Sequence, residues 1–163
     1  MQELRELPTV RVLLFDPGHR LLLMKGRITH APDAPSWWFT VGGGIEAGET
    51  VEEAARREIA EESGFHDIRL GPVVWQREGI GQLSDGERVM FRERYLVAHC
   101  HGGEPVRDGW EPHEIALVDD LRWWHLEEMR SSTERMFPKG LAGLLPVIIA
   151  GQYPDEPLVL EWA

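Results

Sequence analysis

The chain has 163 residues, of which 42% are hydrophobic and 28% charged, a composition typical of one soluble folded domain. We therefore expect a single domain over residues 1–163. The formal net charge of −11 argues against a broad surface for nucleic acid polymers or anionic membranes, because both require a basic footprint. A phosphorylated small molecule remains compatible with this charge if a divalent cation lies between the two sets of negative groups.

Cysteine usage and hydropathy favour the cytoplasm. Cys100 is the single cysteine, so an internal disulfide is excluded. The segment Met1–Pro8 carries charges and lacks the apolar core of a signal peptide. The longest apolar stretch, Leu141–Ala150, is about half the length that a bilayer-spanning helix needs.

The first third of the chain predicts three strands. Thr9–Phe15 and Leu21–Lys25 are rich in Val and Leu, and the Asp16-Pro17-Gly18 turn between them predicts a hairpin. Gly26–Pro35 is polar and contains proline, so we expect a loop. Trp37–Val41 predicts a short strand that leads directly into three consecutive glycines.

A helix is predicted next, because both of its ends carry stop signals. Thr50 is a good N-cap, Glu53 completes a capping box, and Gly64 ends the element. Four apolar residues recur at helical spacing and predict its buried side. They are Val51, Ala54, Ala55 and Ile59.

The remaining chain alternates between strands and helices. Strands are expected at Arg69–Gln76, Arg88–Cys100 and Ile115–Trp124, with a turn at Gly79–Gly86 and a loop at His101–Pro112. Helices are expected at Leu126–Arg130 and Leu141–Ala150. This order predicts an α/β sandwich rather than a pure sheet or a helix bundle.

The predicted central helix carries an unusual set of acids. Glu58, Glu61 and Glu62 stand at positions i, i+3 and i+4, so their carboxylates share one helix face and repel one another. Carboxylate oxygens are the ligands that Mg²⁺ and Mn²⁺ prefer. Taken alone, the pattern is also that of a solvated acidic helix face.

The spacing Gly43-x5-Glu49-x7-Arg57-Glu58-Ile59-x-Glu61-Glu62-x-Gly64-Phe65 resembles the Nudix box at every position. The resemblance implies a Nudix hydrolase with an α/β/α sandwich around a mixed sheet, which cleaves a pyrophosphate bond in a nucleotide derivative. It further implies that Glu58, Glu61, Glu62 and the carbonyl of Gly43 hold Mg²⁺, or Mn²⁺ in its place. Arg57 would orient Glu58 toward the metal.

Identification of the general base is less direct. A carboxylate that binds a cation tightly is a poor proton acceptor, so the base is expected outside the box helix. Glu114, just before the last predicted long strand, is our preferred candidate, since loops after strands can close over a substrate. Glu93 and Glu58 are the alternatives.

Substrate contacts are predicted from the flanking strands. Lys25 and Arg27 follow the second strand, and Arg92 and Arg94 share one face of a later strand; all four are candidates for phosphate binding. A solvated surface charge explains each of them equally well. Either Trp37 or Trp38 is expected in the core and the other against a base or sugar, with Trp37 as the candidate.

Two alternatives to this function remain at this stage. A catalytically silent Nudix-like module that binds nucleotides or proteins would lack one or more box acids, and here all are present. An isomerase or transferase on the same fold is disfavoured by the intact hydrolytic box. Among hydrolase substrates, nucleoside triphosphates or modified nucleotides rank first, nucleotide sugars such as ADP-ribose second and dinucleoside polyphosphates third.

The apolar tail Pro157–Trp162 covers either a neighbouring molecule or the chain's own core. The resemblance to small Nudix proteins favours a homodimer.

Overall fold

The computed structural model describes residues 3–27, 33–83, 85–106 and 118–162. Its elements are β1 (Arg5–Phe15), β2 (Leu21–Arg27), β3 (Ser36–Gly44), α1 (Val51–Ser63), β4 (Arg69–Gln82), β5 (Arg88–His99), β6 (Val118–Trp124), α3 (Leu126–Ser131), β7 (Met136–Phe137), α4 (Leu141–Ile149) and β8 (Leu158–Val159). The strands form one mixed sheet in the order β6-β2-β3-β1-β5-β4-β8, with β7 paired to β3.

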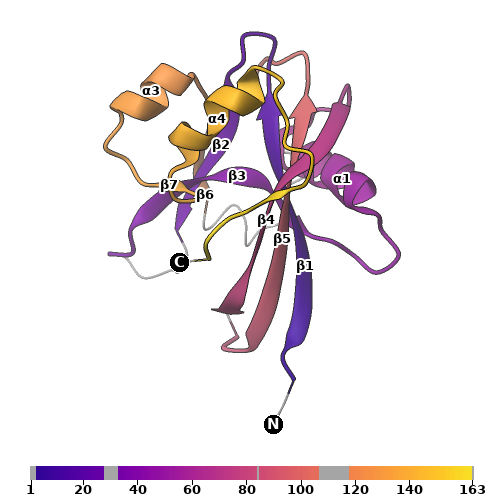
Figure 1. Ribbon diagram of the computed structural model, residues 1–163. Helices are drawn as coiled ribbons and strands as arrows, with labels where there is room; N and C mark the ends of the chain where they lie inside the picture. Colours follow the sequence, from indigo (N-terminus) through magenta and orange to yellow (C-terminus); the bar gives the residue numbers. More distant parts are fainter. Residues whose placement is uncertain (1–2, 28–32, 84, 107–117, 163) are drawn as a thin grey trace.

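Helices cover both faces of this sheet (Figure 1). The side chains of α1 pack with alternate residues of β1 and β5, including Val12, Leu14 and Leu96. The side chains of α3 and α4 pack on the opposite face, against Trp75 and Tyr95. The predicted α/β sandwich is therefore confirmed, with one apolar core on each side of the sheet.

Pairing of the first two strands differs from the predicted hairpin. The turn is present, since the Asp16 carboxylate accepts hydrogen bonds from the backbone N–H of Arg20 at 2.8 Å and from its Nε at 2.7 Å. However, Phe15 and Leu21 are the single residue pair that joins β1 to β2. The strands then separate because β3 lies between them and pairs with both.

Strand β1 thereby becomes central. It runs antiparallel to β3 and parallel to β5, and it begins at Arg5, four residues before the predicted start at Thr9. Arg11 on this strand pairs with Gly42 on one side and with Tyr95 on the other. Residues of β1 therefore lie beside the end of β3, where Gly42 and Gly43 stand.

The strand β4 is longer than predicted, because Gly79 and Gly81 belong to it and not to the following turn. A Cβ at Gly79 would collide with the ring of Trp162, and one at Gly81 would lie 2.6 Å from the ring of Phe91. These glycines thus make room for aromatic rings on an extended strand.

The C-terminal segment occupies that room. β8 runs parallel to β4, and the N–H of Leu160 donates to the carbonyl of Gln76 at 2.8 Å. Trp162 stacks on Phe91 with a centroid distance of 5.6 Å and donates from Nε1 to the carbonyl of Ile80. The apolar tail therefore packs on its own sheet.

The helix α1 has the predicted ends. The side chain of Thr50 accepts from the N–H of Glu53 at 3.1 Å, and the Glu53 carboxylate accepts from the N–H of Thr50 at 3.0 Å. Gly64 has a φ of 80°, the left-handed conformation that suits glycine at a helix end. A capping box of this kind contributes about 1 kcal/mol to helix stability. It fixes where α1 begins, and with it the positions of the acids along the helix.

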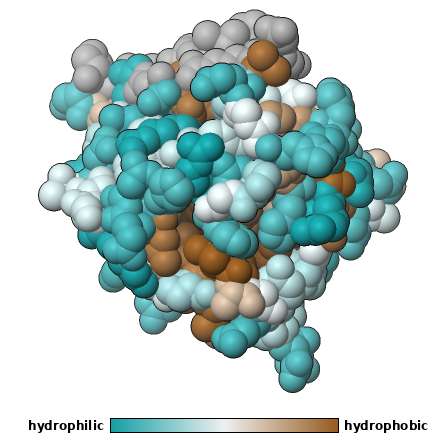
Figure 2. Space-filling model, turned by 90° about the horizontal axis from the view of Figure 1, so that it is seen from above, coloured by the Kyte–Doolittle hydropathy of each residue, from teal (hydrophilic) through white to brown (hydrophobic). Residues whose placement is uncertain are grey.

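One face of the molecule is mostly polar. Seen from above, hydrophilic side chains dominate, and apolar ones show mainly within a hollow near the centre (Figure 2). No helix in the described part of the chain has the length and apolar composition to cross a membrane.

Candidate active site

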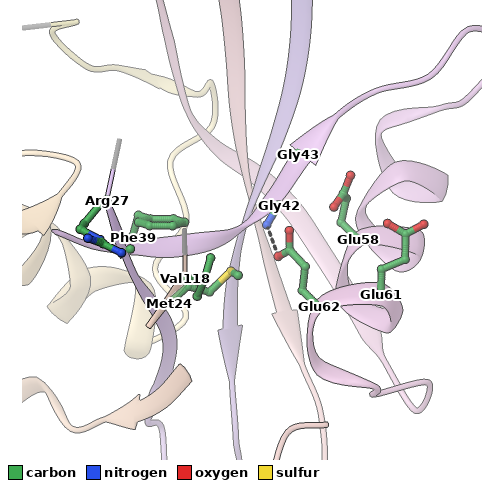
Figure 3. A pocket seen from close by; sticks show the side chains of 10 residues that line it. Met24, Arg27, Phe39, Gly42, Gly43, Glu58, Glu61, Glu62 and Val118 are labelled. Atoms are coloured by element: carbon green, nitrogen blue, oxygen red, sulfur yellow. Dashed lines mark hydrogen bonds between the residues drawn. The ribbon is translucent and has the colours of Figure 1, made fainter. Parts of the chain in front are cut away.

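Three glutamates of α1 line one pocket with the end of β3. Glu58, Glu61 and Glu62 stand on the side of the helix that faces Gly42 and Gly43 (Figure 3). The cavity has a volume of about 340 Å³. Its other lining residues are Met24, Gly26, Arg27, Phe39 and Val118. The acids predicted from the sequence are thus brought together with the glycines.

Two of these carboxylates are buried beside each other. Glu62 is 5% exposed and Glu58 is 8% exposed. Burial raises the pKa of Glu62 well above the ordinary value, and the charge of Glu58 raises it further, against the N–H of Gly42 and the charge of Arg11. Burial likewise raises the pKa of Glu58, although Arg57 opposes it. The positive groups that oppose these shifts are Arg57, which contacts Glu58, and Arg11, whose charge acts on Glu62.

Arg57 connects the helix to the loop before it. Its Nε and Nη2 donate to the two oxygens of Glu49 at 2.7 and 2.8 Å, and Nη2 also donates to the carbonyl of Gly44 at 2.9 Å. Nη1 donates to Glu58 at 2.9 Å and to Glu61 at 3.4 Å. The guanidinium lowers the pKa of Glu49 to about 2. Arg57 therefore holds the Glu58 carboxylate by a hydrogen bond, and its role in orienting Glu58 toward a metal stays a prediction.

The residues suit a hard divalent cation by the chemistry of their donor atoms. Carboxylate and backbone carbonyl oxygens are the preferred donors for Mg²⁺ and Mn²⁺, and a cation would relieve the repulsion between Glu58 and Glu62. Within the described residues, no three acidic, histidine or cysteine side chains converge closely enough to hold a metal ion. To join Glu58 and Glu62 around a cation, Glu61 would have to turn; its side chain is 43% exposed and its contact with Arg57 is 3.4 Å, so such a turn would cost little.

Gly43 leaves no room for a side chain. A Cβ at this position would lie 2.5 Å from one carboxylate oxygen of Glu58, so the carboxylate must shift if the glycine is replaced. We expect Gly43→Ala to reduce turnover on the order of 10²-fold, since a displacement of about 1 Å at a reacting centre has that effect. Steady-state kinetics with a cleavable nucleotide checks this.

Gly44 provides the matched control. A Cβ there meets no atom within 4 Å, so Gly44→Ala changes the same loop without touching Glu58. We expect near wild-type turnover for Gly44→Ala and equal thermal stability for both variants. Equal loss of turnover in both variants would contradict a specific role for the Gly43–Glu58 contact.

A larger aromatic pocket adjoins the acidic one. Gly26, Arg27 and Phe39 line both cavities, and the second has a volume of about 510 Å³. Its aromatic residues are Trp37, Phe39, Phe91, Tyr95, Phe137 and Trp162. We call this cavity the aromatic pocket. The acidic pocket and the aromatic pocket therefore share a wall.

The structure separates the two neighbouring tryptophans. Trp38 is 3% exposed and packs edge-on against Trp124 at a centroid distance of 5.1 Å, so it belongs to the core. Trp37 lines the aromatic pocket and meets Phe137 edge-on at 6.0 Å.

The other proposed substrate contacts lie in different places. Arg27 lines both pockets, whereas Lys25 pairs with Glu134 at 3.0 Å and lines neither. Arg92 is exposed and pairs with Glu6 and Glu78, and Arg94 is exposed on the same face of β5. Neither Arg92 nor Arg94 lines either cavity.

Among the base candidates, Glu93 does not line the acidic pocket. Its carboxylate is 5% exposed, lines the aromatic pocket and pairs with Arg11 and Arg77. Glu114 lies outside the described residues.

Sequence reasoning missed Arg11 and Arg77 of the aromatic pocket, and it named Glu93 only as a candidate base. Arg11 stands in a run of Val and Leu, where a central strand would normally be apolar on both faces. Arg77 and Glu93 come from different strands that pair at this position. The isolated Arg11 within that apolar run was the available signal.

The chain was compared with protein families and with known proteins. Residues 5–146 match the NUDIX domain. The chain is 49% identical over 125 residues to an oxidized purine nucleoside triphosphate hydrolase of Danio rerio, covering 71% of this chain and 75% of that protein. It is 44% identical over 131 residues to an RNA pyrophosphohydrolase of Caulobacter vibrioides, covering 74% and 73%.

The fold is similar to that of a solved structure. The crystal structure of a MutT NUDIX hydrolase from Burkholderia pseudomallei is 27% identical, with a TM-score of 0.54 over 85% of this chain and 95% of that chain. The family match, the sheet between two helical layers and the box glutamates around one pocket agree with one another. The chain therefore belongs to the Nudix hydrolase family.

Proposed function

We propose that this protein uses Mg²⁺, or Mn²⁺ in its place, to hydrolyse a pyrophosphate bond in a nucleoside triphosphate or modified nucleotide. The observation that carries the proposal is the shared wall of the two cavities, Gly26, Arg27 and Phe39. Phosphates in the acidic pocket and a base in the aromatic pocket would belong to one bound molecule. The name of the Danio rerio relative supports this substrate class.

Glu58, Glu61, Glu62 and the carbonyl of Gly43 would hold the cation. When bound, it neutralises phosphate oxygens and lowers the pKa of a water molecule. Arg57 donates hydrogen bonds to both Glu49 and Glu58, and thereby holds Glu58 in place. Phe39 and Trp37 cover the base from the side of β3, which excludes water from that half of the substrate.

The experiment is an assay of purified protein with Mg²⁺ against a panel of nucleotides, with products identified by mass. The panel contains nucleoside triphosphates, oxidized purine nucleotides, ADP-ribose, a dinucleoside polyphosphate and a short 5′-triphosphorylated RNA. We expect a nucleoside triphosphate to have the highest kcat/KM. The net charge of −11 disfavours the RNA, because a polymer requires a basic track. Binding without cleavage of any compound would favour the silent-module alternative.

We propose Glu114 as the general base. Glu114→Gln should lower the rate on the order of 10²-fold or more between pH 6 and 10, with the Mg²⁺ affinity intact. A pH–rate profile and a metal titration of the variant measure both quantities. Unchanged turnover and an unchanged profile would return the role to Glu58.

Association into a homodimer also stays a prediction. The segment Pro157–Trp162 supports a dimer less than we expected from the sequence, because Leu160 and Trp162 pack on the chain's own β4. Light scattering at assay concentration decides between monomer and dimer. Localisation in the cytoplasm is likewise proposed, from the single cysteine alone.

A further inference from the structure

The aromatic pocket has a charged floor that comes from three neighbouring strands. Arg11 on β1, Arg77 on β4 and Glu93 on β5 all line it. Arg77 is 4% exposed and Glu93 is 5% exposed. Charged side chains are rarely buried to this extent unless they are paired or bind a ligand.

Arg77 is held by several contacts within the protein. Its Nε donates to Glu93 at 2.7 Å, its Nη2 lies 2.6 Å from the same oxygen, and its Nη1 donates to the carbonyl of Trp162 at 3.2 Å. Its guanidinium carbon lies 4.3 Å from the ring centre of Phe137 and 4.4 Å from that of Trp162. Arg77 thus holds the pocket wall in place and offers little to a ligand.

Arg11 is different. Its Nε donates to the second oxygen of Glu93 at 3.4 Å, and its side chain is 27% exposed. Within the described residues, no hydrogen bond is formed by its two Nη atoms. Both oxygens of Glu93 already accept from guanidinium groups. The charged floor therefore presents hydrogen-bond donors to a bound molecule rather than acceptors.

A planar base that meets this floor must present acceptors. A 6-oxopurine carries two adjacent acceptors, O6 and N7, which match the paired donors of a guanidinium. Adenine has a donor at its N6 amino group beside N7, and that amino group faces the N–H groups of an arginine unfavourably. The aromatic walls accept either ring equally, so discrimination depends on the floor.

We propose that Arg11, held by Glu93 at the floor of the aromatic pocket, makes the enzyme select 6-oxopurine nucleotides over adenine nucleotides. This inference rests on the proposed function, because it takes the aromatic pocket as the site of the base. It assigns to Arg11 the role of a specificity-determining residue.

The test compares kcat/KM for GTP, ITP, 7-deaza-GTP and ATP. The wild-type enzyme should favour GTP and ITP over ATP by about 10- to 100-fold, the range of one good bidentate contact. 7-Deaza-GTP, which lacks the N7 acceptor, should fall between them. Arg11→Met should reduce the GTP-to-ATP ratio to within about 3-fold. Arg11→Lys keeps the charge beside Glu93 but lacks the fork, and should lose most of the discrimination.

Arg5→Met is the matched control. Arg5 lies on the same face of β1, is exposed and pairs with Glu87 outside the pocket. We expect the wild-type ratio in Arg5→Met. Thermal denaturation should show all three variants folded, since Arg77 still pairs with Glu93 when Arg11 is replaced.

A binding measurement separates this inference from the proposed function. GMP and AMP have no pyrophosphate bond and share the same ribose and phosphate, so the difference between their affinities in a calorimetric titration without metal reports on the base. Weaker GMP binding in Arg11→Met with unchanged AMP binding would support the inference even if no nucleotide were hydrolysed. Equal losses for GTP and ATP would show that Arg11 contacts phosphate or ribose, and would overturn it. A wild-type enzyme that hydrolyses GTP and ATP equally would also overturn it and leave the proposed function standing.

Discussion

Chelation of divalent cations is expected to abolish hydrolysis by this enzyme, and added Mg²⁺ or Mn²⁺ should restore it. Without a cation, the buried carboxylates of Glu58 and Glu62 repel each other and would also repel the phosphates of a substrate. Turnover before and after EDTA treatment, followed by a titration with Mg²⁺, measures the effect.

The added Mg²⁺ should also stabilise the folded protein. A ligand that binds the native state alone adds about 2.7 kcal/mol to the free energy of unfolding at a concentration 100 times its Kd. We expect the melting temperature to rise with Mg²⁺ in the wild-type protein and to change much less in Glu61→Gln. Full turnover in metal-free buffer would reject the assignment of Glu58, Glu61 and Glu62 as ligands.

Replacement of either Glu61 or Glu62 by glutamine is expected to lower turnover by a factor on the order of 10² or more. This corresponds to about 2.7 kcal/mol of lost transition-state stabilisation. Glutamine keeps the shape of the side chain and removes the charge that a cation requires. Glu52→Gln is the control, because Glu52 is exposed in the first turn of the same helix.

Replacement of Glu62 by glutamine should not destabilise the folded protein, although it lowers turnover. The pKa of this buried carboxyl is raised in the folded protein, so the folded state pays for its ionisation at neutral pH. Glu62→Gln removes that charge, and its amide oxygen can still accept from the N–H of Gly42, a bond of 2.9 Å in the native protein. The metal-free variant should therefore be as stable as the wild-type protein or more so. Normal turnover in this variant would contradict the metal-binding role of Glu62, and an unfolded variant would contradict the prediction on stability.

The central helix and its chemistry are determined locally. The capping residues Thr50, Glu53 and Gly64 lie within a few positions of the turns that they fix, so the sequence predicts both helix ends correctly. The i, i+3 and i+4 spacing of the glutamates then places them on one face without reference to any other element. The family resemblance rests on the same local stretch and is confirmed by the match over residues 5–146.

Strand pairing depends on distant residues and was decided by the tertiary structure. The turn at residues 16–20 indicated a hairpin, but β3 displaced β2 as the partner of β1, because β3 pairs along both strands. Gly79 looked like part of a turn until the ring of Trp162, 83 positions later in the chain, filled the space beside it. Local turn chemistry carries no information about such a contact.

The division between core and pocket was likewise a tertiary decision. Trp37 and Trp38 are equivalent in the sequence, and only the position of Trp124 behind Trp38 shows which ring is buried. The floor of the aromatic pocket assembles Arg11, Arg77 and Glu93 from three strands whose order in the sheet differs from their order in the chain. The sequence by itself therefore determined the helix, its acids and the reaction class, since these depend on local spacing. The tertiary structure decided the shape and charge of the substrate pocket, because these depend on which strands lie side by side.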